Sequence, residues 1–214
     1  MEIASHLNEL LILAAVMLLG VMSPGPDFVM AVRNSVRHGR AAGLMTAVGL
    51  GLGVMVHLTY IMLGLGVIIS QSILLFNLLK WFGAAYLFWI GIKAIRSKGM
   101  KLQAAEMHEL KTPYPVKRAL ADGFLTNVLN PKATLFFLAL FTQILSPNVA
   151  AELKFVYSVV CVTITVSWFS IVATVLTQPK IRDVFLRFSK WVDRMCGAVF
   201  IMLGLRLVTA KAGH

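Results

Sequence analysis

Residues 10–32 read LLILAAVMLLGVMSPGPDFVMAV, an apolar run long enough to cross a membrane but interrupted beyond its middle. About 20 apolar residues span a bilayer as a helix. The interruption is Ser23-Pro24-Gly25-Pro26-Asp27, and a proline removes one helix hydrogen bond and clashes with the preceding turn. Because serine is a good N-cap and proline is favoured at the first helical position, the run predicts a broken helix whose second half starts at Pro24.

A second apolar run, 119–145, carries a similar interruption. Asn130 stands there before Pro131 and Lys132, so a second half-helix is predicted to start at Pro131. At about 1.5 Å per residue, the breaks lie about 21 Å from one face of the membrane and about 18 Å from the other. Both depths fall in the middle third of a hydrocarbon core of about 30 Å.

These two runs belong to a set of six apolar blocks in a chain that is 58% hydrophobic and 14% charged. The blocks are too long and too uniform for barrel strands, and backbone groups inside a bilayer must find partners within a helix. The sequence therefore predicts an all-α polytopic protein, with 1–214 as a single membrane domain and the first and fourth helices broken. The blocks are 10–32, 43–69, 72–95, 119–145, 155–177 and 195–210.

The distribution of charge predicts an orientation. The 214 residues carry a formal net charge of +11, and the basic residues gather in every second connection, over 33–40, 93–118 and 180–194. This positive-inside pattern predicts both termini outside, and it explains the charge better than nucleic-acid binding does. Residues 180–194 mix basic with apolar side chains and predict a short interfacial helix. The N-terminal run lacks the positive start of a cleaved signal, so the first span is expected to remain.

A polar linker, 98–118, divides the chain into two parts of three spans each, 1–97 and 119–214. Because each part has an odd number of spans, the two parts enter the membrane from opposite sides, as the two halves of an inverted repeat do. The two proline breaks occupy corresponding places in the two parts. In transporters built this way, such breaks mark the binding site near the midplane.

The two breaks therefore supply most of the candidate site residues. Asp27 is either a turn residue or a partner for an ammonium group. Lys132 stands at the positive end of a half-helix dipole inside the membrane, so it is expected to need an anion, either Asp27 or a bound carboxylate. The full set of candidate substrate-binding residues is Ser23, Pro24, Gly25, Pro26, Asp27, Asn127, Asn130, Pro131, Lys132 and Trp168.

Other polar residues in the spans have two interpretations each. His57 is a packing residue or, with Asp27, a carrier of a coupled proton. Trp168 packs, or it faces an ammonium group by a cation–π contact. Gly49, Gly53 and His57 share one helix face, and the GxxxG pair predicts close approach of a neighbouring helix.

Enzymes and metalloproteins leave no signature in this sequence. It has no HExxH, GxSxG or P-loop motif, so no catalytic site, cofactor or bound metal is predicted. Two alternatives to organic substrates stay open at this point. A metal-cation exporter would use Asp27, His57 and Asp122. A thiol-redox carrier would use Cys161 and Cys196, which are better explained as buried apolar side chains.

Together, the six spans, the SPGPD break and the LTNxxNPKA stretch resemble the LysE/RhtB family of amino-acid exporters. The matching residues are 23–28 and 125–133, and the run 190–193 with Gly197 and Gly204 resembles the threonine-exporter branch. The resemblance covers nearly the whole chain. Where that branch carries a Glu in the fifth span, this chain carries Thr163 and Thr165, which puts threonine itself in doubt.

The resemblance implies a secondary transporter in the bacterial inner membrane that exports threonine, homoserine or a similar small amino acid by proton antiport. Its partners are then the amino acid, protons and the lipid bilayer, with a homo-oligomer left open. The expected mechanism is alternating access around a midplane site. Lys132 and the half-helix N-termini would face the carboxylate, and Asp27 would hold the ammonium until a proton releases it.

Overall fold

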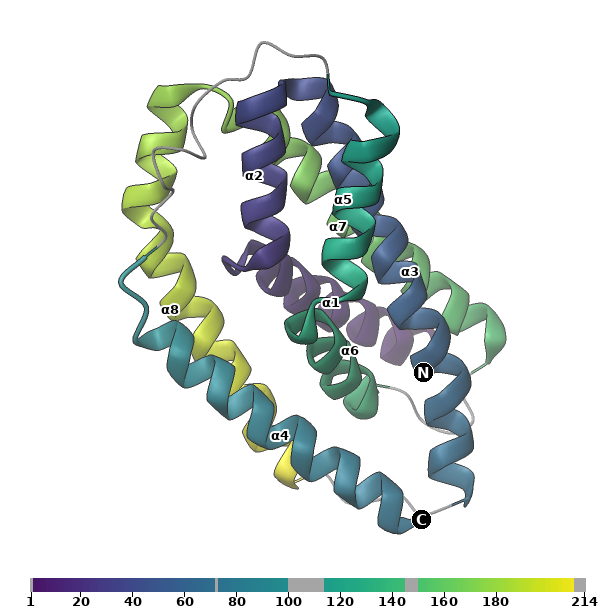
Figure 1. Ribbon diagram of the computed structural model, residues 1–214. Coiled ribbons are helices and arrows are strands. Elements are labelled where there is room, and N and C mark those ends of the chain that lie inside the picture. Colours follow the sequence, from purple (N-terminus) through teal and green to yellow (C-terminus); the bar gives the residue numbers. More distant parts are fainter. Residues whose placement is uncertain (1, 72, 100–113, 145–149, 210–214) are drawn as a thin grey trace.

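The computed structural model describes residues 2–71, 73–99, 114–144 and 150–209, and every regular element within them is a helix. The described residues form eight helices, and Figure 1 shows how they are arranged. Their bounds are α1 Glu2–Met22, α2 Pro26–His38, α3 Arg40–Gln71, α4 Ile73–Ile95, α5 Val116–Val128, α6 Pro131–Ile144, α7 Ala151–Val175 and α8 Pro179–Thr209.

Both predicted breaks are present. The axes of α1 and α2 differ by 60°, and those of α5 and α6 by 56°. The second break starts a new helix at Pro131, as predicted, but the first does so at Pro26 and not at Pro24. Gly25 occupies the N-cap position, so Ser23 and Pro24 belong to the connection, and Pro26 takes the first helical position that a proline favours.

Two of the helices are long and apolar enough to cross a membrane unaided. They are α3, over Arg40–Gly64, and α7, over Ala151–Val175. Each bent pair passes the same test when its two halves are taken as one span, which gives up to four spans within the described residues. The chain is a polytopic helical membrane protein; the count of six spans and the inverted repeat remain predictions.

Close packing of α3 against α5 confirms the GxxxG interpretation. A Cβ atom added at Gly49 would lie 2.1 Å from the carbonyl oxygen of Leu120, and one added at Gly123 would lie 2.2 Å from that of Thr46. Gly53 stands similarly close to Asn127, next to the second break. The two backbones touch only because these positions lack side chains, and this contact fixes the height of the break relative to α3.

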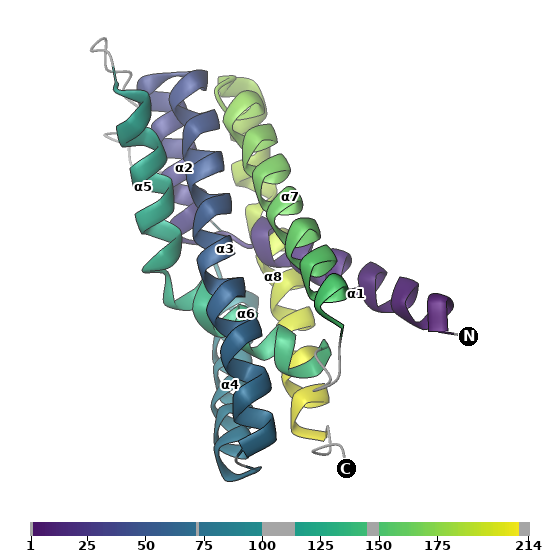
Figure 2. The same cartoon turned by 90° about the vertical axis from the view of Figure 1, so that its right-hand side faces the viewer.

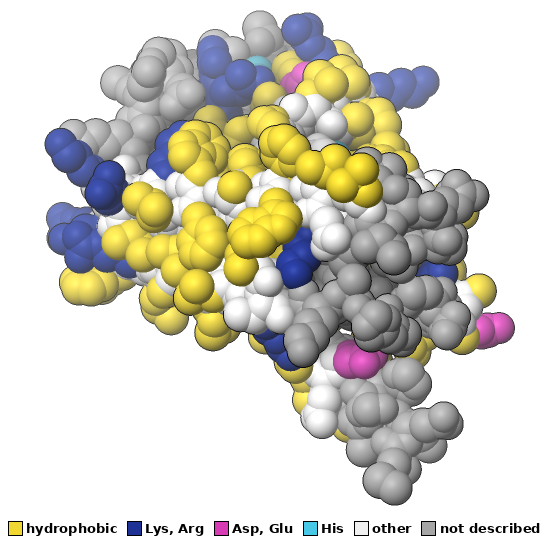
Figure 3. All heavy atoms as spheres, turned by 90° about the horizontal axis from the view of Figure 1, so that it is seen from below, with side chains coloured by type: hydrophobic (Ala, Val, Ile, Leu, Met, Phe, Trp, Pro, Cys, Tyr) yellow, Lys and Arg dark blue, Asp and Glu magenta, His cyan; other side chains and the backbone are white. Residues whose placement is uncertain are grey.

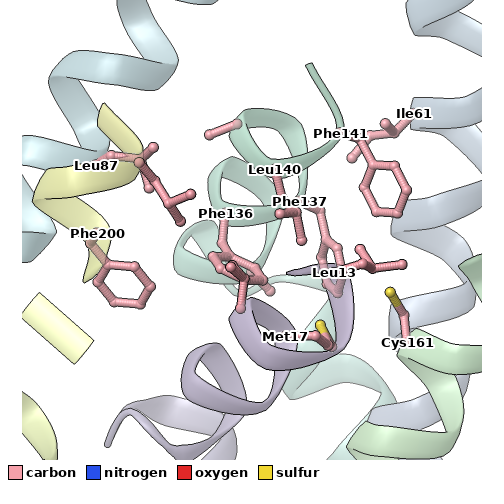
Figure 4. Close-up of a cluster of buried hydrophobic side chains, with 14 of the residues drawn as sticks. Leu13, Met17, Ile61, Leu87, Phe136, Phe137, Leu140, Phe141, Cys161 and Phe200 are labelled. Atoms are coloured by element: carbon pink, nitrogen blue, oxygen red, sulfur yellow. The ribbon is translucent and has the colours of Figure 1, made fainter. Parts of the chain in front are cut away.

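The main apolar core surrounds the broken helices. In Figure 4, side chains from α1, α3, α4, α6, α7 and α8 converge on the aromatic residues of α6. Phe136 contacts Phe137 at a ring-centroid distance of 5.5 Å and Phe200 of α8 at 5.9 Å. Helices α1 and α6, which meet at the centre of this core, are therefore held by packing on their inner faces.

Helices α4 and α8 form a second packing unit beside the bundle of α2, α3, α5 and α7 (Figure 1). They approach closely at Gly91 and Gly197, where a Cβ on either residue would meet the other's carbonyl oxygen within 2.9 Å. Helix α8 runs unbroken from Pro179 to Thr209, so the separate interfacial helix predicted over 180–194 is wrong. That stretch forms the first half of α8, since no proline or glycine interrupts it.

Three of the helix ends that carry basic residues lie on one side of the molecule. The end of α2, the start of α5 and the start of α8 lie at the top of Figure 1, whereas α8 ends at the bottom, and α1 leaves the bundle at a steep angle in Figure 2. Seen from below, apolar side chains cover much of the described surface, and most of the Lys and Arg side chains in view lie towards its upper and left edges (Figure 3). The predicted linker, 98–118, lies mostly outside the described residues, and its last part, from Val116, already belongs to α5.

Candidate functional site

The carboxylate of Asp27 binds the second break. Asp27 is the second residue of α2, and its two oxygens accept hydrogen bonds from Asn127 Nδ2 at 2.7 Å and Asn130 Nδ2 at 3.0 Å. Asn127 lies in the last turn of α5, and Asn130 precedes α6. A residue from the first broken helix therefore holds together the interruption in the second.

Lys132 binds the first break in return. It is the second residue of α6, and its Nζ donates to the hydroxyl of Ser23 at 2.7 Å and to the carbonyl oxygens of Ser23 and Pro24 at 3.0 and 3.3 Å. The expectation that this lysine needs Asp27 or a bound carboxylate is thus incomplete. Carbonyl groups at the end of α1 carry the negative end of a helix dipole and supply the partner.

The two breaks are therefore linked reciprocally. Each second half-helix starts with a proline and then a charged residue, Pro26-Asp27 in α2 and Pro131-Lys132 in α6, and each charge contacts the opposite break. The two N-termini differ in one respect. Asn130 Oδ1 accepts from the Lys132 backbone N–H at 2.9 Å and caps α6, whereas Gly25 has no side chain with which to cap α2. The positive end of α2 remains available to an anion.

Both charges line one small cavity of about 40 Å³. At roughly 10–15 Å³ per water molecule, it holds about three waters, so it is too small to enclose an amino acid as it stands. Phe136, Phe137 and Phe169 form much of its apolar wall. Its polar lining consists of Ser23, Asp27, Asn127, Asn130, Lys132 and Thr165.

A larger cavity of about 460 Å³ lies on the other side of Lys132. The two cavities share Ser23, Gly25, Asn130 and Lys132, and Pro24, Pro26 and Pro131 also line the larger one. Its outer walls come from Tyr86, Trp89, Lys93 and Ser97 at the end of α4 and from Asp193 and Phe200 of α8. Lys132 therefore lies between the small cavity and the large cavity and lines both of them.

His57 does not line either cavity, although it supports the site from behind. Its Nε2 lies 3.0 Å from the carbonyl oxygen of Asn127, and its Nδ1 lies 2.7 Å from the hydroxyl of Tyr60. Since a carbonyl oxygen can only accept, Nε2 carries the proton, and in the neutral ring Nδ1 accepts from Tyr60. Both nitrogens are thus occupied by hydrogen bonds, one to Asn127 and one to Tyr60, which favours the packing interpretation.

We expect His57→Asn to reduce export only in proportion to the amount of folded protein. The substitution removes one buried hydrogen bond, to Asn127, and one partly buried bond, to Tyr60, at about 1 kcal/mol each, but no group that faces the cavity. Measured in the same vesicles, the ratio of gradient-driven export to exchange between equal pools should stay within about twofold of the wild-type value. Loss of gradient-driven export with exchange intact would instead identify His57 as the proton carrier.

Gly53 tests the position of Asn127. A Cβ atom there would lie 2.7 Å from both Cβ and Oδ1 of Asn127, so Gly53→Ala must displace that side chain and its bond to Asp27. We expect at least about a tenfold loss of export per folded molecule, in line with the 1–3 kcal/mol that overpacking typically costs. Gly64→Ala is the matched control on the same helix, because a Cβ there meets no atom within 4 Å. Equal activity of the two variants would show that the position of Asn127 does not matter.

Trp168 is the predicted site residue that the structure leaves away from the others. It packs against the cluster around Phe28 and Phe169, lines neither cavity, and its buried indole nitrogen has no hydrogen-bond partner. Thr165 and Phe169 of the same helix line the small cavity instead. Sequence reasoning also missed Lys93, Ser97 and Asp193, because nothing in the sequence places the ends of α4 and α8 beside the breaks.

Asp122 belongs to a separate polar cluster near the start of α5. It accepts from Tyr114 Oη and from Asn34 Nδ2 at 3.3 Å, and Asn34 also donates to Thr46 at 2.9 Å, so the cluster ties α2, α3 and α5 together. His38 stacks on Tyr114 at 3.8 Å, and burial, with the charge of Arg37 second, lowers the pKa of that imidazole. Within the described part of the chain, no three potential metal ligands lie together. Cys161 and Cys196 are free and buried in the main core.

Comparison with known proteins gives the family. The profile described as LysE type translocator matches residues 18–211. The threonine efflux protein of Salmonella typhi is 32% identical over 198 residues, 92% of this chain and 96% of that protein. The threonine efflux protein of Escherichia coli (strain K12) is 30% identical over 205 residues, 94% and 98% of the two chains. The homoserine/homoserine lactone efflux protein of Salmonella typhimurium is 28% identical over 199 residues, which cover 89% of this chain and 91% of that protein. No solved structure matches.

The match decides between the classes that the sequence left open. It extends over both breaks and leaves out only residues 1–17, which include most of α1, and residues 212–214. A translocator moves its substrate without converting it, so the prediction that the protein is a transporter and not an enzyme is confirmed. With its two proline breaks, its bent helix pairs and a match over nearly the whole chain, this protein belongs to the family of LysE type translocators.

Proposed function

We propose that this translocator exports a small amino acid from the cytoplasm. The relatives named as threonine and homoserine efflux proteins support an amino-acid substrate. The observation that carries the proposal is the presence of Asp27 and Lys132 in one cavity at the two breaks. A free α-amino acid carries one group of each sign at neutral pH, and a cavity inside a membrane accepts such a ligand only if both charges find partners.

In the proposed bound state, the carboxylate lies against Lys132 and the uncapped N-terminus of α2, and the ammonium lies against Asp27. In this structure Asp27 binds Asn127 and Lys132 binds Ser23. When the substrate binds, each of the two charged side chains gives up at least one such hydrogen bond and contacts the substrate instead. Those contacts link the two broken helices. Binding therefore loosens the link and allows the halves to move, as alternating access requires.

Thr165 is the proposed contact for the rest of the substrate. Its hydroxyl donates to the carbonyl oxygen of Cys161 at 2.8 Å, so towards the small cavity it presents an acceptor. A hydroxyl on the substrate side chain would satisfy that acceptor. This favours a hydroxylated amino acid of the size of threonine or homoserine over a longer cationic one.

Asp27 is also the proposed site of proton coupling. A proton that reaches Asp27 from outside removes the charge that holds the ammonium, so the amino acid leaves outward while the proton continues inward. Vesicles loaded with a panel of labelled amino acids test this directly. Export of at least one amino acid that rises with an inward proton gradient supports the proposal, and release of none above protein-free vesicles contradicts it.

We further propose an orientation in the bacterial inner membrane with both termini outside. The basic ends of α2, α5 and α8 lie on the side that the positive-inside rule assigns to the cytoplasm. A reporter fused after His214 should be active only if it functions in the periplasm. Activity of a cytoplasm-only reporter at that fusion would reverse the orientation, and the direction of transport proposed here with it.

A further inference from the structure

The large cavity contains two charged groups that the proposed function does not use, Lys93 of α4 and Asp193 of α8. Asp193 is 5% exposed, and its Oδ2 accepts from Ser97 Oγ at 2.5 Å. Lys93 is exposed at the rim of the cavity, with its Nζ 5.0 Å from the ring centre of Trp89. The hydrogen-bond partner of Asp193 is a neutral hydroxyl, and the charge of Lys132 attracts this carboxylate from the same cavity. A buried carboxylate without a direct bond to a cation is expensive to hold inside a protein, so its place in a cavity wall calls for a ligand.

The cavities place these charges in a definite order. An outer pocket of about 540 Å³ is lined by the cations Lys93 and Arg96 but not by Asp193. The large cavity is lined by Lys93, Asp193 and Lys132, and the small inner cavity by Lys132 and Asp27. From the rim inward, the sequence is therefore Lys93, Asp193, Lys132 and Asp27. The sign of the charge alternates along the whole route.

We infer that the large cavity is an outer binding subsite for a zwitterionic amino acid on its way to the breaks. The carboxylate binds Lys93 and the ammonium binds Asp193, and both groups then move inward to Lys132 and Asp27. The inference rests on the proposed function, because it assigns the same substrate to a second position. It adds a place where the amino acid waits before the two broken helices open.

Size and charge both fit this role. The volume of about 460 Å³ lies in the usual range for small-molecule sites, in contrast to the 40 Å³ of the inner cavity. Tyr86 and Trp89 supply apolar walls beside the charges. The charges along the route alternate in sign. The carboxylate and the ammonium group of the amino acid can therefore each contact the next side chain of opposite charge before they lose contact with the previous one. Neither charge is stranded in a region of low dielectric constant.

The cavity also lies on the side from which an exporter takes its substrate. Lys93 and Ser97 stand at the end of α4, at the start of the basic connection 93–118, which the charge pattern assigns to the cytoplasm. In this arrangement the large cavity opens to the cytoplasm, whereas the small cavity has no room for an amino acid.

Transport kinetics from the cytoplasmic face test the subsite. Asp193→Asn keeps the acceptor for Ser97 and removes the charge. In inside-out vesicles we expect KM for the transported amino acid to rise about tenfold with the maximal rate within twofold, and Asp193→Glu to restore KM. Asp183→Asn is the matched control, since Asp183 is an exposed acid on α8 that lines none of the three cavities. An unchanged KM in Asp193→Asn protein overturns the inference.

A labelling experiment separates failure of the subsite from failure of the proposed function. Ala94 lines the large cavity, so Ala94→Cys should react with a small cationic thiol reagent from the cytoplasmic side, against the background of the parent protein with its two buried cysteines. Millimolar threonine or homoserine should slow this reaction at least fivefold, and Asp193→Asn should abolish the protection. If the wild type transports the amino acid but gives no protection, the subsite alone is wrong. If it transports none of the panel, both proposals fail.

Discussion

Lys132→Met is expected to abolish amino-acid export, with a loss of at least about a hundredfold. Removing one partner of a buried charge contact typically costs about 2–5 kcal/mol, and each 1.4 kcal/mol is a factor of ten. The substitution also leaves the carbonyl oxygens of Ser23 and Pro24 and the Ser23 hydroxyl without their donor. The protein should therefore lose thermal stability as well, although relief of a buried charge alone would predict no loss.

Lys132→Gln separates the two effects. It keeps N–H groups that can donate to the end of α1 and removes the positive charge, so stability should recover while export stays lost. Lys154→Met is the control for loss of a lysine elsewhere, since Lys154 of α7 lines none of the three cavities. Export by Lys132→Gln at half the wild-type rate or more, measured in vesicles with equal amounts of folded protein, would remove the carboxylate role from this residue.

Asp27→Asn has the second large expected effect, again a loss of about a hundredfold or more, with little change in folding. Asn127 Oδ1 is buried against Gly53 and has no hydrogen-bond partner. Turning the Asn127 amide over lets this oxygen accept from the NH₂ group that the substitution introduces, while Asn130 continues to donate to the oxygen that is kept. All hydrogen bonds at the break are then retained, and the change removes only the charge that is proposed to hold ammonium and proton.

Thermal stability and export should therefore respond differently. We expect the midpoint of thermal unfolding to stay within about 3 °C of the wild-type value, because the number of buried hydrogen bonds is unchanged. Export driven by a proton gradient should vanish, and Asp27→Glu should recover part of it. If Asp27→Asn instead unfolds the protein while surviving molecules export normally, Asp27 is a structural residue of the break.

The sequence predicts the breaks well because proline acts locally. Pro131 lacks an N–H group wherever it stands, so a new helix starting there follows from the residue itself, and the polar side chain of Asn130 before it is the expected cap. The close approach of α3 and α5 is predictable for a similar reason, since Gly49 and Gly53 leave room on one helix face. Even the first break is misplaced by only two residues, because Pro24 and Pro26 both satisfy the local rule.

What the sequence could not predict depends on contacts between distant segments. Nothing local to Lys132 indicates that its ammonium group reaches residues 23 and 24, more than a hundred positions earlier. Asp193 looked like one acid in a basic surface stretch, and only the continuous helix α8 and its packing on α4 bring it into a cavity wall beside Ser97. Trp168 looked available to a ligand, yet the rotation of α7 turns Thr165 and Phe169 towards the cavity.

The central claim is that the charged groups of one amino acid bind between the two breaks, with its carboxylate at Lys132. The most direct test is competition for the labelled substrate by the amino acid and by its amide, which keeps the ammonium group but replaces the carboxylate with a neutral carboxamide, in purified wild-type and Lys132→Gln protein. The wild type should bind the acid at least a hundredfold more tightly than the amide, and Lys132→Gln should bind both with affinities within about threefold of each other. Undiminished preference for the acid in Lys132→Gln protein would place the carboxylate elsewhere and contradict the account.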